Sequence, residues 1–190
     1  MECINSFKDR GLLLNKEDKM EDKHIVAITG IIVKDGRYLI TQRNFNKKAF
    51  PGKWTVPGGR LEVGDYIDSL KDTSEHWYNV LENVLRREVK EEVGLEIKNI
   101  KYLTSMAFIR GDEPALIISL YADYKGGEVL LNEESVDYRW VSLEEAKEYD
   151  LIEGIYKELE MLEEILNGRE VGEWGENIKI KKEIENFCAY

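Results

Sequence analysis

The stretch RREVKEEVGL, residues 86–95, holds the strongest local signal in the chain. Good helix formers run up to Val93, and Gly94 is suited to end a helix in the left-handed conformation. At about 100° per residue, Glu88, Glu91 and Glu92 fall within one arc of about 100°. An adjoining edge is apolar, so it can anchor the helix on a sheet; its residues are Leu85, Val89 and Val93.

Three carboxylates one turn apart repel each other, at about 0.2–0.5 kcal/mol per exposed pair. A hard divalent cation such as Mg²⁺ compensates that repulsion, because it takes oxygen ligands from carboxylates, waters and phosphates. The alternative is an exposed acidic helix in which Arg87 and Glu91 form an i, i+4 ion pair. The helix alone leaves both interpretations open.

The composition predicts one packed domain without secretory or membrane segments. The chain has 190 residues, a mass of 22.1 kDa and 43% hydrophobic residues, which is enough for a single core. Charges are scattered through residues 1–20, which excludes a signal peptide and a membrane span, so we expect a cytoplasmic protein. Cys3 and Cys188 have no partner at metal-ligand spacing, so neither a disulfide framework nor a zinc site is expected.

The charge is negative overall but unevenly placed. A net charge of -11 argues against a stable nucleic-acid complex. Residues 36–61, by contrast, carry six lysines and arginines and no acid. This stretch suits a small anionic ligand; alternatively it is a solvated loop and strand edge.

Alternation and turn residues predict a mostly β domain. Residues 24–33 and 37–43 read as a hairpin around an Asp-Gly turn. A polar loop over 44–53 leads into WTVPGG (54–59), a short strand ended by proline and glycines. Further strands are expected at 97–109, 115–124, 128–131 and 138–141. The helices are predicted at 80–93 and at 151–166, the latter following a capping box that starts at Ser142.

Two segments together resemble the signature of the Nudix hydrolases, of the MutT-like type. They are PGGRLEVGD (57–65) and REVKEEVGL (87–95). The signature is Gly, five residues, Glu, seven residues, then Arg-Glu-apolar-any-Glu-Glu-any-Gly-apolar. Gly59 supplies the first glycine, and residues 87–95 fill every fixed place of the second half. The resemblance extends over roughly residues 24–166.

The first half departs from the signature in two ways. Asp65 stands at the place of the first glutamate, and 21 residues separate it from Arg87 where the family has 7. Counted back from Arg87, the same place falls on Asn79, so either residue could partner that arginine. The enlarged loop, about 66–79, has apolar residues spaced as in a short helix. It could cover the site, form a homodimer contact or pack on its own domain without a functional role, and nothing assigns a role to His76 within it.

The resemblance implies an α/β (α+β) fold, a Nudix-type α/β/α sandwich with a mixed, largely antiparallel central sheet. We expect the domain to span residues 24–167, with an N-terminal extension over 1–23 and a C-terminal tail over 168–190.

The resemblance also implies chemistry in which a metal-activated water attacks a diphosphate bridge. By that analogy Gly58, Glu88, Glu91 and Glu92 bind Mg²⁺, or alternatively Mn²⁺, and Arg87 braces the cluster. The general base is Glu88 or a carboxylate from a distant loop, for which we place Glu133 ahead of Glu134.

The substrate expected from the resemblance is a small nucleotide, hydrolysed from a nucleoside triphosphate to a monophosphate and pyrophosphate. Phosphate-binding candidates are Arg43, Lys53 and Arg60, and aromatic candidates for stacking on a base are Phe45, Phe50 and Trp54. The alternatives are an ADP-ribose or nucleotide-sugar pyrophosphatase, and a non-catalytic Nudix-fold nucleotide sensor or interaction module.

Overall fold

The computed structural model describes residues 23–111, 113–169 and 174. Almost all of the predicted N-terminal extension, most of the C-terminal tail and both cysteines lie outside these residues. Seven strands, two α-helices and two short 3₁₀-helices make up the described part. The strands are β1 (Ile25–Lys34), β2 (Arg37–Arg43), β3 (Trp54–Thr55), β4 (Gly58–Arg60), β5 (Glu96–Arg110), β6 (Glu113–Gly126) and β7 (Ser135–Val141). The helices are η1 (Val63–Asp65), α1 (Val80–Val93), η2 (Glu145–Glu148) and α2 (Ile155–Leu166).

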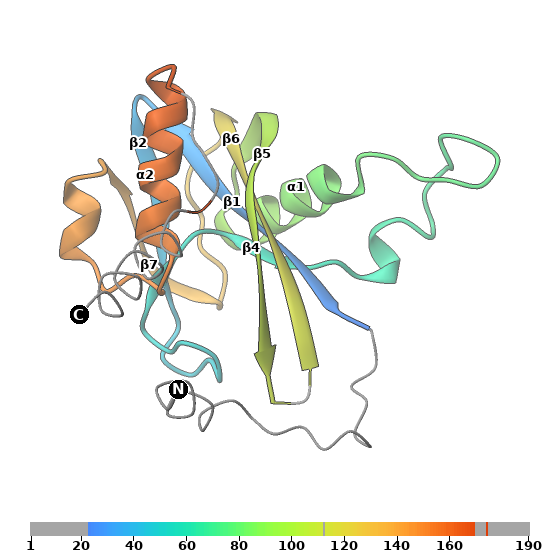
Figure 1. Cartoon of the computed structure of the whole chain (residues 1–190), viewed down its shortest axis with the longest axis horizontal. Coiled ribbons are helices and arrows are strands. Elements are labelled where there is room, and N and C mark those ends of the chain that lie inside the picture. Colours follow the sequence, from blue (N-terminus) through green and yellow to red (C-terminus); the bar gives the residue numbers. More distant parts are fainter. Residues whose placement is uncertain (1–22, 112, 170–173, 175–190) are drawn as a thin grey trace, which may run out of the picture.

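The strands form one mixed sheet (Figure 1). Its main order is β3-β2-β1-β6-β5, with β4 also paired to β1 and β7 to β2. Within the described residues, β1 and β6 run parallel and the other pairs are antiparallel. The mixed, largely antiparallel sheet expected from the sequence is confirmed.

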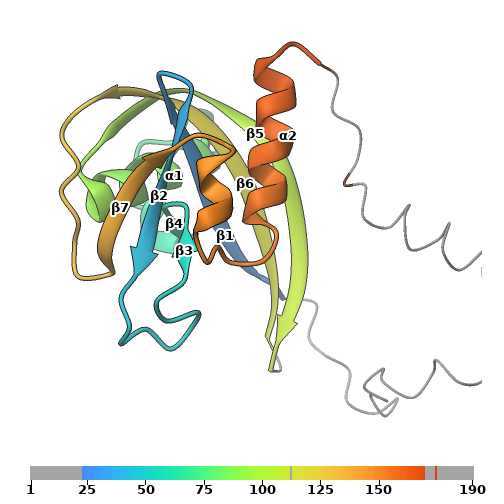
Figure 2. The ribbon, with the colours of Figure 1, turned by 90° about the vertical axis from the view of Figure 1, so that its left-hand side faces the viewer.

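Each face of the sheet is covered by one helix, because side chains alternate between faces along each strand. On β1, Ile28 and Ile32 pack with α1, whereas Ile31 packs with α2. Gly30 lets α1 approach closely, since a Cβ there would lie 2.5 Å from Cδ1 of Leu85. Figure 2 shows α2 in front of the sheet and α1 behind it, which is the α/β/α arrangement.

Three expectations about local structure are wrong, and the start of the last helix is displaced. WTVPGG forms two strands, because the chain changes neighbour at Pro57: β3 pairs with β2 and β4 pairs with β1. Residues 128–131 are not a strand; Leu130 and Asn132 instead donate backbone hydrogen bonds to the carbonyls of Val93 and Glu92. They thus satisfy the open C-terminal end of α1.

The third wrong expectation is the short helix in the enlarged loop, since residues 66–79 contain no helix. They project away from the sheet (Figure 1) and hold themselves together through Trp77, which donates to the Ser69 carbonyl and packs on Tyr66. The expected start of the last helix also shifts. Ser142 and Glu145 do exchange the hydrogen bonds of a capping box, but across the turn that leads into the short η2, and α2 begins after Gly154.

No helix in the described part of the chain is long and apolar enough to cross a bilayer.

Candidate active site

Two of the three signature glutamates on α1, Glu88 and Glu92, face the glycine backbone of β4. The Gly58 N–H donates to Oε2 of Glu92 at 3.0 Å. A Cβ on Gly59 would lie 2.0 Å from Oε1 of Glu88, and one on Gly58 would lie 2.2 Å from the Ile28 carbonyl oxygen. Both glycines are therefore required by space, because any side chain would displace either the carboxylate or the strand.

Arg87 links this cluster to the start of the enlarged loop. Its Nε lies 2.6 Å from Oδ1 of Asp65, and its Nη1 lies 2.9 Å from Glu88 and 3.0 Å from Glu91. The Asp65 side chain is only 6% exposed. Asp65 is thus the partner of Arg87, whereas Asn79 is the left-handed residue that precedes α1.

The Asp65–Arg87 pair is charged on both sides. Burial favours the neutral form of Asp65, but hydrogen bonds from Arg87 and from the Glu62 N–H outweigh burial and lower the pKa of Asp65. Burial works against the charged form of Arg87 too, yet the hydrogen bond to Asp65 and the charge of Glu88 raise its pKa. The guanidinium therefore holds three carboxylates in fixed positions at neutral pH.

The two inward glutamates favour protonation more than an ordinary glutamate. Burial is the largest cause that raises the pKa of Glu88, against the lowering effect of Arg87. Burial also raises the pKa of Glu92 to about 7, with the charges of Glu88 and Glu134 adding to it and the Gly58 hydrogen bond opposing it. Burial and, to a smaller extent, the neighbouring carboxylates penalise the charged forms of Glu88 and Glu92, which is a condition that a nearby cation relieves.

The loop before β7 places Glu134 near the cluster. Its charge raises the pKa of both Glu88 and Glu92, and it forms an ion pair with Lys47 at 2.8 Å. Glu133, the first candidate from the sequence, is exposed, and its carbonyl accepts a hydrogen bond from Asn44. Sequence reasoning did not single out Lys47, although it belongs to the basic stretch 36–61.

The basic candidates for phosphate binding differ in position. Arg43 lies near enough to Glu92 to lower that residue's pKa, and its Nε donates to the Ala49 carbonyl. The Arg60 carbonyl accepts from Arg87, and its side chain is exposed. Lys53, just before β3, is instead paired with Asp150 at 2.5 Å.

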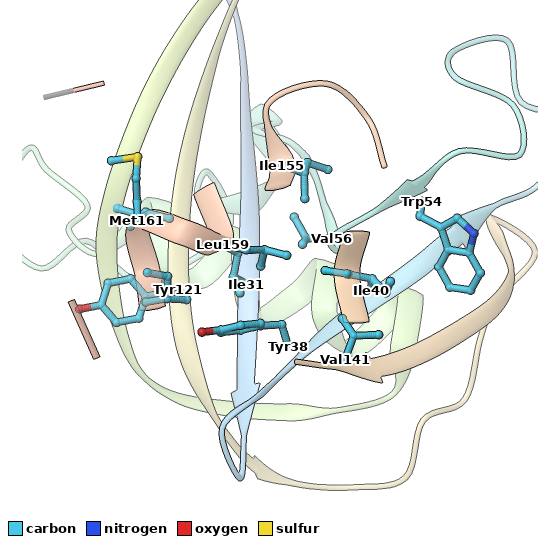
Figure 3. Packing of buried hydrophobic residues seen from close by; sticks show 13 residues of the cluster. Ile31, Tyr38, Ile40, Trp54, Val56, Tyr121, Val141, Ile155, Leu159 and Met161 are labelled. Atoms are coloured by element: carbon cyan, nitrogen blue, oxygen red, sulfur yellow. The ribbon is translucent and has the colours of Figure 1, made fainter. Parts of the chain in front are cut away.

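The aromatic candidates separate in the same way. Trp54 is 8% exposed, belongs to the hydrophobic cluster under α2 (Figure 3) and packs edge-on against Tyr149. It is therefore a core residue with little surface for a base. Phe45 is 66% exposed and lies over Gly52, and Phe50 in the same loop is also exposed. His76 hydrogen-bonds Thr73 within the enlarged loop.

The donor set fits a hard divalent ion in its chemistry. Glu88, Glu91 and Glu92 supply only oxygen atoms, beside a backbone that admits no side chain at Gly58. Among the described residues, however, no group of three carboxylates, imidazoles or thiolates is drawn together closely enough to enclose an ion. Glu91 and Glu92 are instead held by Arg87 and by the Gly58 N–H.

Comparisons with known proteins agree with this geometry. A family model described as "NUDIX domain" matches residues 23–162. The nucleoside triphosphatase NudI of Escherichia coli (strain K12) is 30% identical over 133 residues, covering 64% of this chain and 84% of the relative. NudI of Salmonella agona (strain SL483) is 33% identical over 132 residues, with the same shares covered.

A solved structure shows the same fold. The MutT protein of Methanosarcina mazei Go1 superposes with a TM-score of 0.59 at 24% identity, covering 78% of this chain and 99% of that one. The family match spans most of the chain, and the residues of the Nudix signature meet at α1 and β4. This protein therefore belongs to the Nudix family of hydrolases, which act on phosphoric anhydride bonds.

Proposed function

We propose that the protein hydrolyses nucleoside triphosphates to nucleoside monophosphates and pyrophosphate, with Mg²⁺ or Mn²⁺ bound by Glu88, Glu91, Glu92 and the Gly58 carbonyl. The observation that carries the proposal is the packing of Glu88 and Glu92 against Gly58 and Gly59, braced by Arg87 and Asp65. The relatives that are named nucleoside triphosphatases support the choice of substrate.

A bound divalent ion would lower the pKa of a bound water and neutralise charge on the phosphoryl oxygens. The protein's own residues would position the reacting groups and accept the proton of the attacking water. Glu88 accepts the proton of the attacking water at its carboxylate, with Glu134 as the second candidate for this role. Arg87 orients the carboxylates of Glu88 and Glu91 through its two contacts at Nη1.

The substrate would enter from the basic side of the cluster. Arg43 and Arg60 are the side chains that we assign to the phosphates, since neither is committed to a described carboxylate in an ion pair. We assign Phe45 to stacking on the nucleobase, because its ring is exposed in the loop 44–53 that follows Arg43. Lys53 and Trp54 are left out of this assignment because Asp150 and the α2 core hold them.

The experiment is release of pyrophosphate and phosphate from a panel of nucleoside triphosphates, ADP-ribose and dinucleoside polyphosphates, with and without Mg²⁺ or Mn²⁺. Wild type is compared with Glu91→Gln and Glu92→Gln, and with Glu82→Gln as a control from the first turn of the same helix. We expect metal-dependent pyrophosphate release from triphosphates, lost in the two site variants and kept in the control. Turnover of ADP-ribose alone would support the alternative pyrophosphatase. A folded, inactive protein that still binds nucleotide would support the sensor.

A further inference from the structure

A continuous chain of contacts joins the C-terminal end of α1 to the basic loop 44–53. The Asn132 N–H donates to the Glu92 carbonyl at 3.2 Å, and the Glu134 N–H donates to Oδ1 of Asn132 at 2.9 Å. On its other side, Oε2 of Glu134 lies 2.8 Å from Nζ of Lys47, the one cation that is paired with this carboxylate within the described residues. Glu134 is therefore held from two sides, by α1 through Asn132 and by the basic loop through Lys47.

A turn at Asn44 fixes the backbone that carries Lys47. Oδ1 of Asn44 accepts from the Asn46 N–H at 3.0 Å, and the Asn44 carbonyl accepts from the Lys47 N–H at 3.0 Å, which is a pattern that asparagine favours in turns. The same residue reaches the opposite loop, because its N–H donates to the Glu134 carbonyl at 2.8 Å and its Nδ2 donates to the Glu133 carbonyl at 3.0 Å. The ammonium of Lys47 and the carboxylate of Glu134 thus face each other from backbones that are already bonded together.

Glu134 needs a counter-charge to stay beside the glutamates of α1. Its charge acts on both Glu88 and Glu92, and like charges repel each other. The Glu134 side chain is 42% exposed, so without a cation this repulsion would turn the carboxylate away into water. A lysine ammonium is a compact point charge, and here it offsets the repulsion at the carboxylate that it contacts.

We propose that Lys47 is a positioning residue for hydrolysis: its ammonium keeps the Glu134 carboxylate beside Glu88 and Glu92, where Glu134 acts on the attacking water. This inference rests on the proposed function, in which Glu134 is the second candidate for accepting the proton of that water. Lys47 acts through Glu134, and the substrate phosphates are left to the two arginines assigned above. The adjacent Lys48 is exposed and forms no ion pair with a described residue, so it supplies a matched control.

The test is steady-state hydrolysis of whichever member of the substrate panel the wild type turns over, at saturating Mg²⁺. Lys47→Met removes the charge of the side chain and keeps most of its length. We expect this variant to lower kcat by about 10-fold and to change KM by less than about 2-fold, since groups that orient catalytic residues are worth about 10- to 100-fold. Lys47→Arg returns the charge and should restore kcat to within about 3-fold of wild type, whereas Lys48→Met should leave both constants unchanged.

A double-mutant cycle shows whether Lys47 acts through Glu134. In the Glu134→Gln background, Lys47→Met should lower kcat by less than about a further 2-fold, because the carboxylate that the lysine positions is already gone. Independent, multiplicative losses would overturn the inference, as would a raised KM with a normal kcat, which would place Lys47 on the substrate. An unchanged kcat in Lys47→Met would also overturn it.

Hydrogen exchange gives a second readout that does not depend on turnover. The Glu134 amide should exchange about 2- to 5-fold faster in Lys47→Met than in wild type or Lys48→Met, the range expected when a partly exposed ion pair is lost. Equal exchange in the three proteins would overturn the positioning role and leave the proposed activity intact. Faster exchange in Lys47→Met, with a wild type that hydrolyses no member of the panel, would refute the proposed function and still support Lys47 as the residue that holds Glu134.

Discussion

Nε of Arg87 donates a 2.6 Å hydrogen bond to Oδ1 of Asp65, across a separation of 22 residues that includes the whole enlarged loop. The aspartate that stands at the place of the first signature glutamate thus reaches Arg87. We predict that Asp65→Asn lowers kcat/KM by about 10- to 100-fold, the range for partners that orient metal-binding groups. It should also lower the free energy of unfolding by about 1–2 kcal/mol, because a charge-assisted hydrogen bond is lost from a partly exposed arginine.

Asn79 supplies the control, since it is the other residue that spacing alone allowed at this place. Asn79→Gly keeps the left-handed conformation at φ 53° without strain. Steady-state kinetics and urea unfolding of both variants should show an effect at Asp65 only. Equal losses at the two positions would contradict the assigned pairing.

Glu134 and Glu133 make a second matched pair. We predict that Glu134→Gln reduces kcat by about 10-fold or more, because this charge acts on both Glu88 and Glu92. Glu133→Gln should change kcat by less than about 2-fold, since its side chain is exposed. The measurement is kcat at saturating triphosphate and Mg²⁺ for both variants, and the reverse order would return the assignment to Glu133.

Replacement of the two aromatic side chains near β3, Phe45 and Trp54, should affect different properties of the protein. Phe45→Ala is expected to raise KM by about 5- to 100-fold with little loss of stability, because base stacking is worth about 1–3 kcal/mol. Trp54→Ala should instead lower the free energy of unfolding by about 3–5 kcal/mol, as expected for a buried tryptophan. Urea unfolding and substrate titration distinguish these effects. A stable Trp54→Ala variant with a raised KM would place the base at Trp54.

The fold and the site differ in how much of them the sequence predicted. The hairpin, the two long strands and α1 follow from periodicity and turn residues, and each lies where it was expected. The prediction of a strand at 128–131 was wrong because this backbone donates a hydrogen bond to the C-terminal end of α1, a tertiary contact that the local pattern does not encode. The prediction of a helix in the enlarged loop was also wrong. Trp77 and Tyr66 pack on each other, so they are not available as the apolar face of a helix that packs on the domain core.

The site shows the same division. The three glutamates on one face of α1 could be read from helix geometry, and the family signature pointed to Gly58 and Gly59. The sequence could not decide between Asp65 and Asn79 as the partner of Arg87, because that choice depends on where a long loop returns in space. Glu158 gave a local signal that was overlooked: it lies on the same stripe as Ile155, Leu159 and Leu162, so a buried carboxyl could have been expected.

Glu158 leads to a prediction about pH. It is 2% exposed and receives a hydrogen bond from Ser119, which in turn contacts Thr29. Burial raises its pKa to about 7, with the Ser119 hydrogen bond opposing. The folded state therefore binds this proton more tightly than the unfolded state. Its stabilising contribution is complete below the ordinary glutamate pKa of about 4.3 and is lost as pH rises through about 7.

Replacement of the carboxyl by an amide should remove this dependence. We expect Glu158→Gln to be more stable than wild type at pH 8.5, by up to about 3 kcal/mol, with the difference reduced to about 1 kcal/mol at pH 5. Urea unfolding at both values measures the difference, with Glu160→Gln as the control from the solvent side of the same helix. A constant difference across this pH range would show that Glu158 does not titrate there.

Deletion of residues 66–79 tests whether the enlarged loop takes part in catalysis. Without them Asp65 is followed by Val80, and seven residues then separate it from Arg87, which is the spacing of the family signature. The side-chain contacts of Trp77 and His76 lie inside the loop, and loop length alone changes stability by only about 0.6 kcal/mol per doubling. We therefore expect the shortened protein to keep its fold and to retain kcat/KM for triphosphates within about 10-fold. A folded variant with normal kcat and a strongly raised KM would instead show that the loop contacts the substrate, and loss of metal-dependent turnover would show that the loop holds Asp65 in place.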